Sequence, residues 1–344
     1  MPRAVGVESV AAFKKAAAWG TPVVCGAGDG LYILPPTIKR ERGFEKDKSI
    51  GKFHAVAGDH GSIKVEGDIP AFLRYDGLDL FIAMAMGLTA GVPSLLGGSA
   101  YSQSFLLADN LEGLFGTFCV NNKVNIDECP SAKITGLVLK GEAGKPLEIS
   151  FPVLADDMVE DSAVNTLATF ASVTLPELKH RVLFSQGVFR MNDASGAALA
   201  AGDVINPSSF ELTHKFAQSG AYAAGQGDKI DEPANSGAPE ITLKLEFPRY
   251  TSEALITDWR AGTAKKLDMV FTGQEITTPY NRSSSLLFPN LVIKNAGAPQ
   301  EEGAIKHSLE FECLATEAAP AGMTGILNPF QWDVINTKSA DVLA

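Results

Sequence analysis

The sequence predicts a mainly β fold of the α+β class, built from two tandem, duplicated units that are each a β-sandwich or half-barrel with one flanking α-helix. Three observations lead to this prediction. Short segments alternate apolar and charged residues, two separate stretches carry helix signals, and the first half of the chain matches the second at several ordered places. Strands follow each helix in runs, which argues against a parallel βαβ sheet.

The internal matches begin at residues 72–75 (Phe-Leu-Arg-Tyr), which resemble residues 247–250 (Phe-Pro-Arg-Tyr) at an offset of 175 residues (247 − 72). The same offset relates three further pairs, Leu80 with Leu255, Phe81 with Ile256 and Gly87 with Gly262. Other matches follow at other offsets: residues 137–140 with 291–294, residues 151–155 with 311–315, and Pro36 and Phe44 with Pro207 and Phe216. Offsets drift when loops change length, so we interpret the chain as an old duplication.

These matches divide the chain into a first unit at residues 1–157, with its core at 21–157, and a second unit at residues 180–316. Residues 158–179 are predicted to form a partly helical linker. Residues 317–344 are predicted to form a C-terminal arm that docks on a neighbouring copy. The segments 39–61 and 217–237 are charged or rich in Gly, Ala and Ser, which predicts exposed excursions.

Two segments alternate most clearly. Residues 63–69 and 241–247 each place apolar side chains on one face and polar ones on the other, the latter being Lys64, Glu66, Asp68, Thr242, Lys244 and Glu246. This pattern is typical of antiparallel strands with one side in water. Further strands are predicted at residues 102–107, 116–120, 134–140, 147–153, 182–190, 209–216, 266–272, 286–294 and 305–314.

Two helices are predicted. Residues 76–86 are apolar almost all round and are followed by Gly87, which predicts a buried helix with a glycine stop. Residues 251–261 are amphipathic, with Thr251 or Ser252 as the N-cap and Gly262 as the stop. We interpret Phe81, Met84 and Trp259 on these helices as packing residues and not as a binding site.

Composition excludes several classes of protein. The formal net charge of −11 lacks the basic surplus that binds phosphates, so an acidic face would repel DNA, which suits a conduit but not a DNA reader. The longest apolar run, residues 78–86, is far shorter than the ~20 residues of a membrane span. The N-terminal residues do not resemble a secretory signal, so we expect folding in a cytosol. The four cysteines, Cys25, Cys119, Cys129 and Cys313, are predicted to be buried free thiols.

No catalytic, cofactor-binding or metal-binding residue is predicted, no cofactor is expected, and we expect no enzymatic activity. Residues 25–31 resemble a glycine loop, but a dinucleotide site needs glycine where Leu31 stands and a helix where Pro35 and Pro36 follow, so a turn is predicted. The acidic residues Asp156, Asp157, Glu160 and Asp161 are interpreted as the solvated start of a linker helix. The five histidines, His54, His60, His180, His214 and His307, lack metal spacing and are interpreted as surface or strand-face residues.

Several segments together resemble a known family. They are the alternating strand at 63–69, the Tyr75-x-x-Leu78-x-x-Phe81 helix, residues 101–105 (Tyr-Ser-Gln-Ser-Phe), and the strands at residues 132–137 and 144–151. This pattern resembles the tail tube (major tail) proteins of long-tailed bacteriophages, over most of residues 21–316. In that family, strands of neighbouring units join into one barrel around a lumen, and rings stack into a tube that conducts DNA.

The resemblance implies a virion structural protein, the major tail tube subunit, synthesised in the bacterial host cytoplasm. Its implied partners are other copies of itself, other tail proteins, the tape-measure protein and passing DNA that it does not read, with no membrane. Six units make the usual ring, so two units per chain suggest a trimer with pseudo-sixfold symmetry, with a hexamer as the alternative. Two other functions stay open: another ring-forming virion or injection-machine protein, such as a baseplate or contractile-tube component, and a carbohydrate-binding β-sandwich protein.

Overall fold

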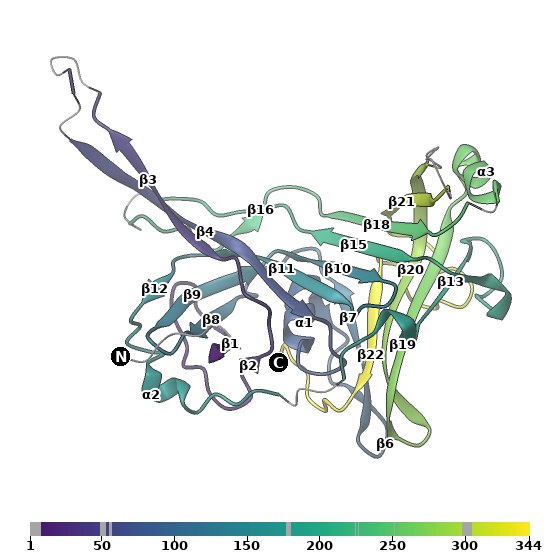
Figure 1. Ribbon diagram of the computed structural model, residues 1–344, viewed down its shortest axis with the longest axis horizontal. Coiled ribbons are helices and arrows are strands. Elements are labelled where there is room, and N and C mark those ends of the chain that lie inside the picture. The colour runs from purple at the N-terminus through teal and green to yellow at the C-terminus, as the bar shows by residue number, and fades with distance from the viewer. Residues whose placement is uncertain are drawn as a thin grey trace.

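The computed structural model describes residues 8–48, 53–54, 57–176, 180–223, 225, 227–250, 252–297 and 305–344. The mainly β fold is confirmed. One broad sheet spans the molecule, α1 packs beneath it, and the strands β3 and β4 project from one end as a hairpin arm (Figure 1). In the described part of the chain no helix is long and apolar enough to cross a membrane.

The described residues of the first half of the chain form twelve strands and two α-helices. They are β1 (Val10–Lys15), β2 (Gly30–Leu31), β3 (Lys39–Lys46), β4 (Gly58–Phe72), α1 (Asp79–Met86), β5 (Gly87–Thr89), β6 (Ser94–Gly97), β7 (Ala100–Leu107), β8 (Gly116–Asn121), β9 (Ile126–Ile134), β10 (Gly136–Glu142), β11 (Glu148–Ala155), β12 (Val159–Glu160) and α2 (Leu167–Phe170). The helix α2 lies within the predicted linker.

In the part of the second half that the structure describes there are ten strands and one α-helix. They are β13 (Gly187–Asp193), β14 (Val204–Ile205), β15 (Ser209–Lys215), β16 (Gln218–Ser219), β17 (Ala234–Asn235), β18 (Glu240–Phe247), α3 (Ala254–Ala261), β19 (Lys265–Thr277), β20 (Tyr280–Gly297), β21 (His307–Cys313) and β22 (Gln331–Asn336).

Eight antiparallel strands form the broad sheet, in the order β3-β4-β11-β10-β15-β18-β21-β20. The first four belong to the first half of the chain and the last four to the second. The pair β10–β15 joins the halves through seven consecutive residue pairs, from Gly136↔Lys215 to Glu142↔Ser209. We call this pair the internal junction.

The outlying strands pair in a recurring pattern. In the first half β8 pairs with β9 and β1, and β1 also pairs with β2. In the second half β19 pairs with β20 and β13, and β13 also pairs with β14. The short strand β12 returns to β9 as β22 returns to β20. The two halves thus share one order of pairing. Among the described residues, the pairs that β5 and β6 form with β7 have no counterpart in the second half.

The predicted C-terminal arm is corrected by the structure. Residues 331–336 do not extend from the body but form β22, which lies between β20 of the second half and β7 of the first. Phe330 and Trp332 are fully buried there, and the Trp332 Nε1 donates to the Ser284 hydroxyl at 2.8 Å. Phe330, Trp332 and Val334 alternate along the strand and are buried on one side, so this segment packs against the core of its own chain.

The two helices differ in burial as predicted. Every residue of α1 except Leu80 is buried, and the Phe81 ring lies 4.7 Å from Phe13 and 5.1 Å from Phe151, centroid to centroid. No residue of α3 is buried. Both helices end at a left-handed glycine, Gly87 at φ +91° and Gly262 at φ +68°, because only glycine adopts this conformation without strain.

Several predicted boundaries were wrong. The N-cap of α3 is Glu253 with no side-chain cap bond, whereas Ser252 accepts from the Ala254 amide and Thr251 lies outside the described residues. The strand predicted at residues 134–140 is broken at Thr135, so β9 and β10 are separate. Residues 184–186 form a 3₁₀ turn, so the strand predicted from residue 182 begins at Gly187. The excursion predicted at 39–61 contains β3 and the start of β4.

Candidate assembly surface

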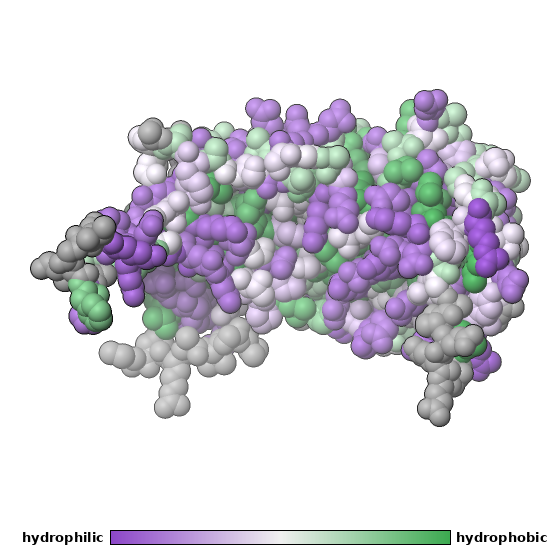
Figure 2. Space-filling view, turned by 90° about the horizontal axis from the view of Figure 1, so that it is seen from above, coloured by the Kyte–Doolittle hydropathy of each residue, from purple (hydrophilic) through white to green (hydrophobic). Residues whose placement is uncertain are grey.

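One face of the eight-strand sheet carries charged side chains, most of which are exposed. Figure 2 looks down on this side of the molecule and shows hydrophilic residues across it. The opposite face holds the core, because residues of alternate positions such as Leu139, Ile149, Leu212, Leu243 and Phe311 are at most 1% exposed. We call the charged side the polar face.

Charge alternates along a row that crosses five strands of the polar face. Successive cross-strand partners are Glu148, Lys140, Glu211, Lys244 and Glu310. Side chains that lie directly opposite in neighbouring antiparallel strands are close enough to interact, and opposite charges there are favourable. The row therefore runs unbroken through the internal junction, where the Lys140 Nζ and Glu211 Oε1 are 3.4 Å apart.

The polar positions singled out from the sequence all lie on this face. Lys64, Glu66 and Lys244 are exposed, and Lys64 pairs with Glu66 at 2.8 Å. Thr242 is nearly covered, at 8% exposure, because it lies between Thr213 and Glu312. Acidic residues outnumber basic ones on the face. The acids are Glu41, Glu66, Asp68, Glu142, Glu148, Glu211, Glu240, Glu246, Glu310 and Glu312, and the bases are Lys39, Lys64, Lys140, Lys215, Lys244 and Lys294.

The internal junction is held on its core side by apolar residues. Leu137 faces His214 and Leu139 faces Leu212, and all four side chains are completely buried. Gly136 fits only as glycine, since its φ is +155° and a Cβ would lie 2.2 Å from the His214 carbonyl oxygen. The two halves therefore meet through a regular, dry strand pair. A hollow of about 570 Å³ on the polar face beside this junction is lined by charges of both signs, including Lys140, Glu211 and Lys244.

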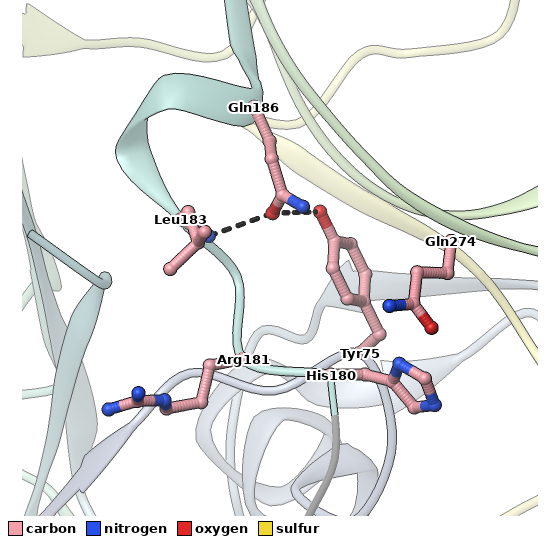
Figure 3. Close-up of a pocket in the computed structure, with 6 residues that line it drawn as sticks. All are labelled: Tyr75, His180, Arg181, Leu183, Gln186 and Gln274. Carbon is pink, nitrogen blue, oxygen red and sulfur yellow. Dashed lines mark hydrogen bonds between the residues drawn. The ribbon is translucent and has the colours of Figure 1, made fainter.

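A smaller cleft has a volume of about 230 Å³. Figure 3 shows the residues that line it, among them Tyr75, Leu183 and Gln186. The Gln186 Oε1 accepts from the Tyr75 hydroxyl at 3.0 Å and from the Leu183 amide at 2.9 Å, and burial raises the pKa of Tyr75. The Arg181 guanidinium does not point into the cleft and instead lies over the Phe72 ring at 5.4 Å. Small-molecule sites usually exceed ~300 Å³ and converge several polar groups, so this cleft resembles a packing gap.

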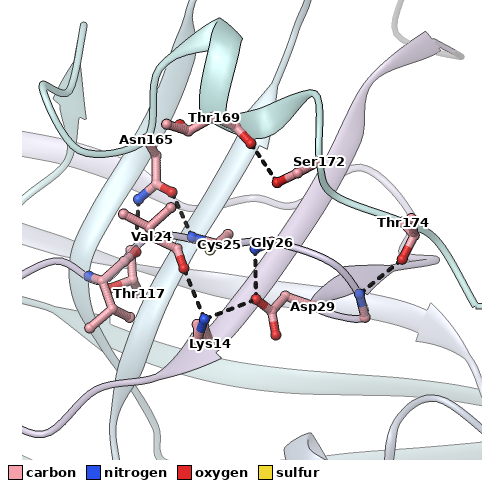
Figure 4. A network of polar contacts seen from close by, with 12 residues as sticks. Lys14, Val24, Cys25, Gly26, Asp29, Thr117, Asn165, Thr169, Ser172 and Thr174 are labelled. Carbon is pink, nitrogen blue, oxygen red and sulfur yellow. Dashed lines mark hydrogen bonds and ion pairs between the residues drawn. The ribbon is translucent and has the colours of Figure 1, made fainter.

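The glycine loop at residues 25–31 is tied to its own chain (Figure 4). The Gly26 amide donates to the Asp29 carboxylate at 2.7 Å, and the Gly28 amide donates to the Thr174 hydroxyl at 2.9 Å. The Cys25 amide donates to Asn165. A phosphate cradle needs these N–H groups free and a helix after them, but residues 32–38 contain no helix. The loop therefore serves as a structural turn.

The acidic residues at the start of the linker are not a solvated helix start, and this interpretation was wrong. Asp156 and Asp157 are 1% and 5% exposed, and no helix begins within residues 156–166, all of which the structure describes. Asp157 pairs with Arg40 and Lys229 at 3.0 Å each, so it braces the base of the β3–β4 arm. Burial raises the pKa of Asp156, which accepts from the Ser131 amide. Glu160 and Asp161 are exposed.

The histidines and cysteines differ in burial. The four thiols are buried, as predicted. His214 and His307 are strand-face residues in the core, and burial lowers the pKa of His214 to about 4. His54 and His60 are exposed, and His180 is half-buried. Within the described ranges no three His, Cys, Asp or Glu side chains gather as a metal site would require.

Residues at the two ends of the sheet were not singled out from the sequence. Among the residues that the structure describes, residues 292–297 of β20 pair with β21 alone at one end, and β3 pairs with β4 alone at the other. Sequence patterns report which face of a strand is buried but not which strand lies beside it, so these edges give no local signal. Pro35 and Pro36 were the nearest clue, because proline is confined to sheet edges.

Comparison with protein families gives one match, to the family described as phage tail tube protein, over residues 6–313. A search of the curated proteins finds no match. The matched residues include every strand of the eight-strand sheet and both α1 and α3. The chain therefore belongs to the phage tail tube protein family and is a self-assembling structural component of the phage tail, within the virion.

Proposed function

We propose that this chain is the main subunit of the tail tube, that its copies close into rings, and that stacked rings form the hollow tail through which DNA passes into the host. The observation that carries the proposal is the strand order of the broad sheet. Four strands of the first half, β3-β4-β11-β10, are followed by β15-β18-β21-β20 of the second half in the same order of pairing.

The two halves are interpreted as two copies of one unit. Under this interpretation β1 to β4 correspond to β13, β14, β15 and β18, and α1 corresponds to α3. β8 corresponds to β19, β9 and β10 together correspond to the long strand β20, β11 corresponds to β21, and β12 corresponds to β22. Buried pairs support it, because Leu137 and Leu291 are both fully buried, as are Phe151 and Phe311. The first unit then spans the strands up to β12, the linker contains α2, and the second unit runs on into β22.

The internal junction suggests how a ring is built. A unit that meets the next one edge to edge inside the chain can meet a third unit in the same way, and a head-to-tail contact whose rotation closes gives a ring. Six units around the axis require three chains, so we propose a trimer with pseudo-sixfold symmetry. The alternative is a hexamer in which only one unit of each chain surrounds the channel.

The polar face is proposed to line the channel. Its acidic excess repels the phosphate backbone, so DNA and the tape-measure protein would pass without being held, and no sequence is read. The alternating row that includes Lys140 and Glu211 keeps the surface hydrated without a large basic patch. If the polar face lines the channel, replacing Glu211, Glu246 and Glu310 together by lysine should leave the rings intact. Phage particles that carry this variant, prepared from lysates of infected cells, should release their DNA more slowly.

The proposal is tested by electron microscopy and native mass spectrometry of the purified protein at rising concentration. We expect rings or tubes whose mass corresponds to three chains of 36.3 kDa per ring. Six chains per ring would overturn the trimer and favour the alternative. A protein that stays monomeric at all concentrations, with or without other tail proteins, would contradict the tube function. Rings that never stack would favour a baseplate component, in which a ring is made once.

A further inference from the structure

Residues 227–237 belong to the second half of the sequence but lie against the first half. The segment that contains β16 leaves β15 and extends over the first half, toward the base of the β3–β4 arm (Figure 1). The Trp19 Nε1 donates to the Ile230 carbonyl at 3.0 Å, and the Asn235 Nδ2 donates to the Asp109 carbonyl at 2.9 Å. Because each of these contacts joins the two halves, we call residues 227–237 the strap.

One end of the strap is anchored in the first half by a buried ion pair. The Lys133 side chain is 1% exposed, and its Nζ donates to the Glu232 Oε1 at 2.6 Å and to the Pro233 carbonyl at 2.8 Å. The Gly113 amide donates to the same Glu232 oxygen at 2.7 Å, and Ile230 is 9% exposed. A buried cation that loses its partner is strongly destabilising, so this end of the strap is held firmly.

The other end of the strap contacts both strands of the arm at its root. The Asp228 carbonyl accepts from the Ile63 amide at 2.7 Å, and the Asp228 carboxylate pairs with Arg42. Ile63 and Arg42 lie directly opposite each other in β4 and β3. Just before the strap, the Tyr222 hydroxyl donates to the Ile63 carbonyl at 2.8 Å. Asp228 and Tyr222 therefore bind both polar groups of the Ile63 backbone.

A second link between the strap and the arm passes through Asp157. Its carboxylate pairs with Lys229 of the strap and with Arg40 of β3, at 3.0 Å each. Because Asp157 is 5% exposed, salt screens these pairs less than it would at the surface. The strap and the arm are thus joined at two places.

The strap continues the support that β11 gives to β4. β11 pairs with β4 from Phe72 to Val65. Ile63 is two residues beyond Val65, so its N–H and C=O point to the same edge of β4. Farther out, the described residues of β3 and β4 pair only with each other, and all eight residues of β3 are exposed. A two-stranded hairpin is marginally stable in water, so the last supported residue decides where the arm can bend.

We infer that the strap positions the β3–β4 arm, so that the second half of the chain fixes the direction in which the arm leaves the first half. Asp228 and Tyr222 are the positioning residues, and the ion pair of Lys133 with Glu232 keeps the strap in place. The inference concerns a single chain and does not depend on the proposed ring.

Hydrogen exchange of the full chain, followed by mass spectrometry below the concentration of assembly, tests the inference. Asp228→Ala combined with Tyr222→Phe removes an ion pair and a hydroxyl donor at the root of the arm. Peptides that cover β3 and the start of β4 should exchange about tenfold faster, the factor expected for one or two lost hydrogen bonds. Peptides of β18 should exchange as in the wild type. The matched control, Lys64→Ala, removes an exposed ion pair with Glu66 from the same part of β4 and should leave β3 unchanged.

The direction of the arm is measured separately from its exchange. Spin labels are attached at Glu45→Cys in β3 and at Val124→Cys in the turn between β8 and β9, two exposed positions. The native thiols are at most 4% exposed, so the labels go to the new cysteines. We expect a narrow distribution of distances between the labels in the otherwise unchanged chain and a broader one when Asp228→Ala and Tyr222→Phe are added.

A variant at the anchored end tests whether the strap acts as one piece. Glu232→Gln keeps the shape of the side chain but removes the charge that balances Lys133. In the described part of the chain Glu232 has no hydrogen bond or ion pair with the arm. We nevertheless expect β3 to exchange faster in this variant, by a smaller factor than in the double variant. Thermal melting checks that each variant is folded, and the double variant decides the question by itself if Glu232→Gln does not fold.

The outcomes separate the inference from the proposed function. Unchanged exchange of β3 and an unchanged distance distribution in the double variant would overturn the inference. An equal rise of exchange in β18 would also overturn it, because the variant would then lower the stability of the whole chain. Unchanged exchange of β3 in folded Glu232→Gln would overturn the role of the anchored end. Because the unassembled chain is measured, a protein that forms no rings would overturn the proposed function and leave the inference standing.

Discussion

Lys140 and Glu211 form an ion pair across the internal junction, with the Nζ and Oε1 atoms 3.4 Å apart, and so connect the two halves of the chain on the polar face. Lys140 also lies opposite Glu148, so one lysine separates two acidic residues in the cross-strand row. Its side chain is 56% exposed and that of Glu211 is 38% exposed. An exposed pair of this kind contributes little to stability by itself.

Reversing the charge of Lys140 tests the row. Lys140→Glu places three acids side by side and should lower the free energy of unfolding by less than ~1 kcal/mol, measured by urea denaturation at low salt. Combining it with Glu211→Lys restores opposite charges across the junction but leaves like charges beside both Glu148 and Lys244, so the double variant should recover little of that loss. Added salt should reduce the difference between the variants, and a loss that is insensitive to salt would show that the row does not act through charge.

Gly136 should be the most sensitive glycine of the internal junction. Gly136→Ala adds a Cβ 2.2 Å from the His214 carbonyl oxygen at φ +155°, so it forces the two strands apart and should cost roughly 3 kcal/mol or more in unfolding free energy. Gly113→Ala provides the control, because Gly113 has φ +73° but nothing within 4 Å of the added atom. It should cost only about 1 kcal/mol. Equal losses in the two variants would contradict the close approach.

His214 should make stability depend on pH. Burial lowers its pKa from 6.5 to about 4 in the folded state, so between those values the unfolded chain binds a proton that the folded chain excludes. Stability is unaffected by this residue above pH 6.5 and falls as the pH drops toward 4, by about 2 kcal/mol between pH 7.5 and pH 5. The unfolding free energy measured at both pH values should show this loss.

His214→Leu should remove that part of the pH dependence, and the exposed His60→Leu should not. Burial raises the pKa of Asp79 and Asp156, and their effects run the other way, since stability is lost as the pH rises through their folded values. Because both carboxyl groups remain in each variant, comparing variant with wild type isolates the histidine. An unchanged pH profile in His214→Leu would contradict the assignment.

Trp332 should be required for the two halves to stay together. Its indole is fully buried in β22 and donates to Ser284, so Trp332→Ala removes a large core side chain and should cost about 4 kcal/mol. Ser284→Ala leaves the indole N–H unpaired and should cost about 1–2 kcal/mol. Leu327→Ala, at a nearby position that is 46% exposed, should change the unfolding free energy by less than ~0.5 kcal/mol.

Patterns that arise within one element could be predicted from the sequence. Alternation between apolar and charged residues predicted which face of β4 and β18 is wet, and the glycines Gly87 and Gly262 predicted where α1 and α3 end. The family was predicted from the order of these elements, and the family match confirms it.

The match at residues 72–75 and 247–250 was misleading at the level of single residues. Phe247 shares a face with buried Leu245 and packs against the core, whereas Phe72 follows buried Ala71 and lies on the other face, under Arg181. An alignment at an offset of 175 therefore matches residues that point to opposite faces of the sheet. A shift of one residue along a strand moves every side chain to the other face. The order of strand pairing is the more reliable sign of equivalence.

Long-range pairings could not be predicted. Nothing within residues 331–336 shows that their partners are β7 and β20, more than forty residues away in either case. The burial of Asp157 also depends on distant cations, Arg40 and Lys229, which neutralise a charge that the local sequence presents as solvated. Such contacts exist only once the fold is complete.

The place of β22 sets an order of events on the ribosome. This strand pairs with β20 and β7, which are both synthesised before it. A nascent chain that has not yet produced residue 336 therefore lacks this link between the halves and keeps only the internal junction and side-chain contacts such as Lys133–Glu232 and Arg282–Asp76. Prematurely terminated chains would lack the Trp332 wedge and should be removed by proteolysis before they reach a growing tube. The order of synthesis would thereby select for full-length chains, because only a chain translated through β22 could be incorporated into the tail.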